Sequence, residues 1–145
     1  MKFDLLSTCK IDEFSLKWRW TDEKYCLMPE NDLSEIRPLT QHAASITFEN
    51  ALRLTEKTQI EEDGESIETA RGDSAVNSFL SSKLPAEIIL VNWDQDTSVI
   101  TDTATFTKYW DEFCYPSSDD VSVWPEDESW FLQCYHYDRF SFIKI

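Results

Sequence analysis

The sequence predicts a single α+β domain over residues 1–145, with a mostly antiparallel sheet and two or three helices packed on one face. Three observations lead to this prediction. The chain length of 145 residues suits one domain. Apolar runs of strand length alternate with polar turn segments, and segments with helical spacing of apolar residues lie between them. Neither a repeat nor a linker divides the chain.

Three helices are predicted from spacing and end signals. The best is 40–57, where apolar side chains recur on one face: Ala44, Phe48, Ala51, Leu52 and Thr55. A second begins at Asp73 or Ser74 and ends before Pro85. A third begins at Thr103 or Thr105 and runs through Phe113. A shorter helix, 32–37, follows Asn31 as its cap.

Strands are predicted where aliphatic and aromatic residues alternate or run together. The clearest is 87–94, EIILVNWD, a typical core strand. The others are 14–20, 98–101, 121–124, 129–136 and 140–145. The stretch 60–73 contains EEDGESIE, with five acids in eight residues, and is predicted to be an acidic, flexible loop between the two halves.

The charge balance limits the classes of partner. The chain carries 28 acidic and 13 basic residues, a net charge of −15. Such a surface repels phosphate backbones and anionic lipids, so we expect no nucleic-acid and no membrane binding. A basic protein partner fits this charge, and so does solubility alone. No signal peptide is visible and the aliphatic run Ile88–Val91 is too short to span a bilayer, so a cytoplasmic location is expected.

Several kinds of chemical site are not predicted. The only glycines, Gly64 and Gly72, cannot form a phosphate-binding loop. Cysteines at 9, 26, 114 and 134 lack the spacing of a zinc or thioredoxin-like pair, so we expect free, mostly buried thiols, and no cofactor or metal. Cys134 and His136 share one face of a strand at roughly 7 Å, too far for a nucleophile–base pair. His136 is therefore interpreted as structural.

The segment 109–130, YWDEFCYPSSDDVSVWPEDESW, holds most of the candidate binding residues. Asp119 and Asp120 are adjacent in a loop, where two carboxylates can bind a hard cation or act as acid and base. Aspartates after Ser-Ser also commonly cap backbone amides, and this structural role is the preferred interpretation.

A second acidic group, Glu126, Asp127 and Glu128, occupies a turn between two predicted strands. A solvated turn explains it, and the alternative is an acidic epitope for Arg and Lys of a partner. Trp124 and Trp130 flank the turn. Either ring would be a candidate anchor if exposed, because interface hot spots favour Trp.

The block YWDEFCYPSSDDVSVWP, with KWRWTDEKY near the N-terminus, resembles a bacterial family of small acidic proteins of unknown function. The resemblance covers about a third of the chain. It implies a small α+β domain, from a bacterium or a mobile gene cassette, and implies no activity.

Three functional hypotheses follow. The first is a non-enzymatic protein-binding module for a basic partner, similar in composition to immunity proteins and inhibitors. The second is a small-ligand or hydrolytic domain with a pocket near the 115–120 loop, formed by Asp119, Asp120, Tyr109 and His136. The third is a self-associating structural protein. A monomer and a homodimer both remain open.

Overall fold

The computed structural model describes residues 1–115 and 117–145. Its longer helices are α3 (Gln41–Thr58), α5 (Asp73–Lys83) and α6 (Thr103–Lys108). Single turns are η1 (Phe3–Leu5), η2 (Ile11–Glu13), α1 (Trp18–Thr21), α2 (Glu30–Leu33), α4 (Ile60–Asp63), η3 (Thr69–Arg71) and α7 (Trp110–Phe113). Strands are β1 (Cys26–Leu27), β2 (Arg37–Pro38), β3 (Glu65–Glu68), β4 (Ile88–Asn92), β5 (Ser98–Asp102), β6 (Val121–Pro125), β7 (Trp130–Tyr135) and β8 (Arg139–Lys144).

Seven of these strands form one sheet in the order β2-β5-β4-β6-β7-β8-β3. Every strand pair recorded in the described residues is antiparallel. The predicted α+β class and its antiparallel sheet are confirmed. The five strands predicted from 87 onward all form, and their ends agree to within two residues.

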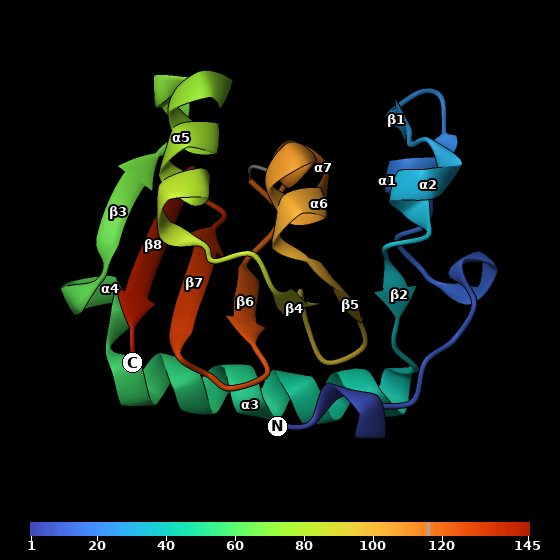
Figure 1. The fold of residues 1–145 in the computed structure, drawn as a ribbon, viewed down its shortest axis with the longest axis horizontal. Helices are drawn as coiled ribbons and strands as arrows, with labels where there is room; N and C mark the ends of the chain where they lie inside the picture. Colours follow the sequence, from blue (N-terminus) through green and yellow to red (C-terminus); the bar gives the residue numbers. More distant parts are fainter. Residues whose placement is uncertain (116) are drawn as a thin grey trace.

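Helices cover both faces of this sheet, whereas the sequence predicted them on one face. Figure 1 shows α5, α6 and α7 on one side of the strands and α3 along the opposite side. Two separate apolar clusters agree with this arrangement. One joins Val76 of α5 and Phe106 of α6 to Val91 of β4, and the other joins Leu54 of α3 to Leu90. Successive residues of β4 therefore point into opposite cores, which is why its sequence is apolar throughout.

The sheet face that α3 covers is half apolar and half polar. Strand register places a row of polar side chains across six adjacent strands: Ser98, Asn92, Ser122, Gln133, Ser141 and Ser66. Neighbours in the row bond to each other, since the Asn92 amide donates to Ser98 Oγ (2.6 Å) and Ser122 Oγ donates to Gln133 (2.8 Å). The Thr47 hydroxyl of α3 extends this hydrogen-bonded row, with its Oγ1 2.7 Å from Ser98 Oγ. Because these groups are partnered, the row can be buried at low cost.

The helix α3 begins and ends close to the predicted 40–57. The Thr40 hydroxyl accepts from the Ala43 N–H at 3.2 Å and caps its first turn. Its last turn is closed by Gln59, which adopts a left-handed conformation (φ 51°). The buried stripe includes Ala44, Thr47, Ala51 and Leu54. Leu52 and Thr55, predicted on this face, are instead exposed.

Four local predictions are wrong. The helix predicted over 32–37 is instead the single turn Glu30–Leu33, which contains Asn31, and Arg37 begins the strand β2. Residues 14–20 do not form a strand, because Arg19 and Trp20 are both buried around the helical turn α1. The stretch 60–73, predicted as a flexible loop, forms α4, β3 and η3. Ile60 is buried beneath α3, and β3 pairs with β8 over four residues. The third predicted helix is interrupted at Tyr109, which separates α6 from α7. No helix within the described ranges is long and apolar enough to cross a membrane.

Candidate functional site

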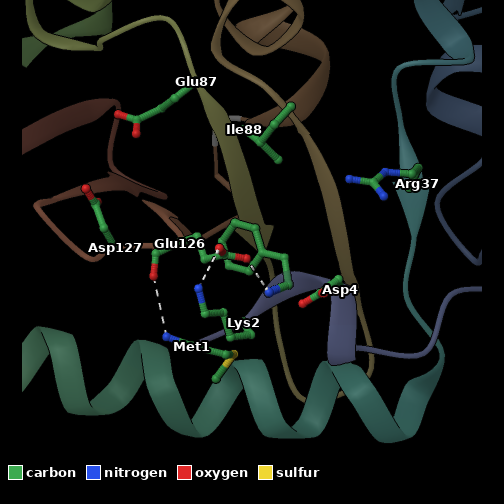
Figure 2. Close-up of a pocket in the computed structure, with 9 residues that line it drawn as sticks. Met1, Lys2, Asp4, Arg37, Glu87, Ile88, Glu126 and Asp127 are labelled. Atoms are coloured by element: carbon green, nitrogen blue, oxygen red, sulfur yellow. Dashed lines mark hydrogen bonds and ion pairs between the residues drawn. The ribbon is translucent and has the colours of Figure 1, made fainter.

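A cavity of about 620 Å³ lies where the N-terminal segment passes the start of β4 and the β6–β7 turn. Its walls come from four separate parts of the chain, and Figure 2 shows Glu87, Ile88 and Arg37 facing Lys2, Asp4 and Glu126 across it. The lining residues are Met1, Lys2, Phe3, Asp4, Arg37, Glu87, Ile88, Glu126 and Asp127. Two of the seven residues predicted from the sequence, Glu126 and Asp127, therefore lie in this cavity.

Glu126 attaches the N-terminal segment to the β6–β7 turn. Its Oε2 accepts from the Phe3 N–H at 2.6 Å, and its Oε1 lies 3.7 Å from Lys2 Nζ. Its backbone carbonyl accepts from the Met1 nitrogen at 3.4 Å (Figure 2). Phe3 is buried against the α3 side of the core. Glu126 therefore has a positioning role, since it holds in place the segment that forms one wall.

Asp127 and Glu87 are fixed by single hydrogen bonds and keep acceptor capacity toward the cavity. Asp127 Oδ1 accepts from the Ser129 N–H at 3.0 Å, and hydrogen bonds from Ser129 lower the pKa of Asp127. Glu87 Oε2 accepts from Trp130 Nε1 at 2.8 Å. A carboxylate has about four acceptor positions, so both groups can accept further donors.

The cavity has an acidic surplus beside an apolar side chain. Four carboxylates line it, from Asp4, Glu87, Glu126 and Asp127, against the side chains of Lys2 and Arg37 and the N-terminal ammonium of Met1, which leaves a surplus of one negative charge. Asp4 is exposed, and Ile88 is 47% exposed. A guanidinium or ammonium group on an apolar stem matches this combination. Within the described residues, no three His, Cys, Asp or Glu side chains are grouped to hold a metal ion.

Asp119 is placed away from this cavity, in a buried ion pair. Its two oxygens accept from Arg19 Nη1 at 2.6 Å and Nη2 at 3.2 Å, and both side chains are almost fully buried. The Tyr115 N–H donates to the same carboxylate at 2.9 Å, and the Arg19 guanidinium lies 4.0 Å from the Tyr115 ring. Asp119 therefore fastens α1 to the loop after α7, consistent with the structural interpretation.

The groups proposed for a pocket near the 115–120 loop do not converge. Asp120 accepts from the backbone N–H of His136 and lies 3.0 Å from its Nδ1, with both side chains more than half exposed. Tyr109 donates instead to Asp32 of α2. Asp119 faces Arg19. The geometry thus offers no common point at which these four groups could act on one ligand.

The two flanking tryptophans do not meet the condition set for anchors. Trp124 is fully buried on the α3 side of the sheet, and Trp130 is 2% exposed on the other side. Glu128 accepts from Asn50 at 2.7 Å and from Arg53 at 2.5 Å, so it connects the turn to α3. Although burial opposes it, these hydrogen bonds lower the pKa of Glu128.

Sequence reasoning missed Lys2, Asp4, Arg37, Glu87 and Ile88 as parts of a site. They lie in three segments far apart in the sequence, at 2–4, 37 and 87–88, and only the fold brings those segments together. One signal was available, because Glu87 directly precedes the strongest strand and Pro125-Glu126-Asp127 directly follows another. In an antiparallel pair those two ends meet, as the Ile89–Pro125 register shows.

The comparisons with known proteins add no relative, since no family model, no curated protein and no solved structure matches this chain. The resemblance of the 109–125 block to a bacterial family therefore stays a prediction.

Proposed function

We propose that this protein is a non-enzymatic protein-binding module, and that its acidic cavity receives a lysine or arginine side chain of a basic protein partner. The observation that supports this most directly is the convergence of four carboxylates from three chain segments around the exposed Ile88. An inserted basic side chain would place its charged end among Asp4, Glu87 and Asp127. Its methylene stem would cover Ile88.

The charge of the whole chain supports the same class of partner. A net charge of −15 accelerates encounter with a basic surface, and the effect weakens as salt screens it. Arg37 and Lys2 offset part of the local charge. They would bias the cavity toward a single basic side chain with a defined position, rather than toward a dense basic cluster.

A capped peptide with a single arginine, acetyl-Gly-Ser-Arg-Ser-Gly-amide, is a defined probe for this cavity. We expect amide NMR shifts on titration to cluster at residues 2–4, 87–88 and 126–127. The triple variant Asp4→Asn/Glu87→Gln/Asp127→Asn keeps the acceptor oxygens that bind Trp130 and Ser129 but removes three charges. It should weaken binding about tenfold, at roughly 0.5 kcal/mol for each charge.

The matched control removes three exposed carboxylates elsewhere, as Glu49→Gln/Glu56→Gln/Asp63→Asn. It has the same net charge as the cavity variant, so a purely long-range attraction would weaken equally in both. An equal loss of affinity in the two variants, or shifts spread evenly over the surface, would refute the cavity as the binding site.

The partner class suggested by composition is a basic toxin or enzyme in a bacterial cytoplasm, neutralised as immunity proteins and inhibitors do. A gene for a basic secreted or nuclease-like protein beside this one would support that class. Light scattering at micromolar concentration would distinguish the monomer from the homodimer, and a dimer that covers the cavity would argue for self-association instead.

A further inference from the structure

Two of the four cysteines lie side by side in the core, away from the acidic cavity. Cys114 directly follows α7, Cys134 lies on β7, and both belong to the apolar cluster beneath α5, α6 and α7. Both thiols are free, and both line one small cavity of about 160 Å³. The other residues around that cavity are Thr69, Trp110, Asp111, Tyr135 and Asp138.

Both cysteine side chains line the same small cavity and belong to the same apolar cluster, so they face one shared space, as a disulfide requires. Burial, followed by contact with the Cys134 thiol, raises the pKa of Cys114 well above its ordinary value. The other two cysteines lie elsewhere in the fold. Cys9 donates from its sulfur to the Leu39 carbonyl at 3.5 Å, and Cys26 lies on the short strand β1.

The backbone at Cys114 is held by a hydrogen bond, since its N–H donates to the Trp110 carbonyl at 2.9 Å. A disulfide needs its sulfurs to approach to about 2.05 Å with a dihedral angle near 90°. Cys114 lies outside the helical turn, with an extended backbone (φ −123°, ψ 97°), at the start of the connection to β6. Its partner is held in the sheet by pairing with Val121 and Phe140. Closing the bond therefore requires rotation of the two cysteine side chains within their shared cavity.

We propose that Cys114 and Cys134 form a modification site, at which a low-molecular-weight disulfide such as oxidised glutathione converts the two thiols into an intramolecular disulfide. Because burial raises the pKa of Cys114, that thiol is the poorer first nucleophile. Cys134 loses its proton to solvent and, as its thiolate, attacks oxidised glutathione and releases one reduced glutathione, which leaves a mixed disulfide. The second cysteine loses its proton to solvent, attacks the protein-bound sulfur and releases the second glutathione. The two thiols lose one electron each, and one oxidised glutathione accepts both.

The disulfide would constrain the segment between the two cysteines, which contains Asp119 and Asp120. The ring of about 20 residues between the cysteines includes Asp119, which holds Arg19, and the whole of β6. Closure of a ring of this size removes conformational freedom from the unfolded chain. The oxidised protein should therefore unfold at a temperature higher by on the order of 5–10 °C. This inference does not depend on the proposed function.

The test uses the full chain with Cys9→Ser and Cys26→Ser, so that only the buried pair can react. After incubation with oxidised glutathione under native conditions, the intact mass should fall by the mass of two hydrogen atoms. A peptide map should link the Cys114 and Cys134 peptides, and the melting temperature should rise. A stable glutathione adduct without closure, or reaction only in denaturant, would overturn the proposal.

Two single-thiol variants serve as controls. In that background Cys114→Ser and Cys134→Ser should each show a glutathione adduct or no change, and never the loss of two hydrogens. If the Cys9→Ser/Cys26→Ser chain fails to fold, peptide mapping of the oxidised wild type decides. A link between 114 and 134 supports the site, and links confined to Cys9 or Cys26 refute it.

Discussion

The two acidic connections of this protein, 119–120 and 126–128, have similar composition and different physical roles. In the first, Asp119 is almost fully buried against Arg19, while Asp120 is more than half exposed beside His136. In the second, Glu126, Asp127 and Glu128 are all in partial contact with solvent, and each holds a different segment: residue 3, the turn itself, or α3. The first connection stabilises the fold mainly through one buried ion pair, and the second does so through several weaker contacts.

This difference shows that burial, more than the number of carboxylates, decides what an acidic residue contributes. A buried carboxylate with an arginine becomes indispensable, because removal of either partner leaves an uncompensated charge. Solvent screens the charge of exposed carboxylates, so removal of one of them changes the free energy of unfolding only slightly. Such carboxylates are available to bind a partner. The cavity uses carboxylates of the second kind.

The largest expected effect comes from the buried pair. Arg19→Met keeps the side-chain volume and leaves Asp119 unpaired, and should destabilise the fold by about 3–5 kcal/mol. Denaturant unfolding at pH 7 measures the loss. The double variant Arg19→Met/Asp119→Leu should recover part of it, because no buried charge remains. Arg71→Met, which removes an exposed charge, is the control and should stay within about 0.5 kcal/mol. A loss below about 1 kcal/mol for Arg19→Met would contradict the buried-pair interpretation.

A smaller effect is expected at the second connection. Glu128→Gln keeps an acceptor for Asn50 but loses the charge that faces Arg53, whose side chain is 48% exposed. Solvent screening limits the cost to about 0.5–1 kcal/mol. A double-mutant cycle with Arg53→Met isolates the pair energy. A coupling energy as large as that of the Arg19–Asp119 pair would contradict the difference between the two connections.

The pH dependence of that effect has a definite sign. The pKa of Glu128 is lowered in the folded protein below its ordinary value of 4.5, so the ionised form favours folding. The stabilisation is fully present above the unfolded pKa and disappears as the pH falls through the folded pKa. Wild type and Glu128→Gln should therefore differ in stability at pH 7 and converge in the acid range below 4.5. A difference that persists unchanged at low pH would assign the effect to lost packing instead.

The strands were predictable because their side chains are apolar on both faces or alternate with a period of two. The β6, β7 and β8 segments carry this signal in VSVW, WFLQCY and FSFI. The run IILV in β4 indicates that helices cover both faces of the sheet, because an uninterrupted apolar strand is buried on both of its faces. The polar row through Ser122, Gln133 and Ser141 was not predictable, because only strand register shows that these isolated residues are neighbours.

The failures have one physical cause, tertiary contact that overrides local pattern. Residues 14–20 alternate like a strand, but Arg19 is drawn inward by a carboxylate 100 residues away. The acidic run 60–68 looks solvated, yet Ile60 and Ile67 provide enough apolar contact, and β8 enough hydrogen bonds, to order it. Seven of the nine cavity residues were missed for the same reason, since segments such as those of Asp4, Arg37 and Glu87 meet only through the fold.

The smallest effect is expected at Asp120, and it tests the comparison most closely because Asp120 is the direct neighbour of Asp119. Asp120→Asn keeps an acceptor for the His136 N–H and removes a charge that is 57% exposed. Its stability should change by less than about 0.5 kcal/mol at pH 7. Denaturant unfolding of Asp120→Asn and Asp119→Asn in the same buffer gives the ratio of their losses in free energy of unfolding. Asp119→Asn leaves the Arg19 guanidinium buried without its counter-charge, and should therefore cost several times more. Equal losses at the two positions would mean that the loop as a whole stabilises the fold, and that the burial of one carboxylate is not what separates these neighbours.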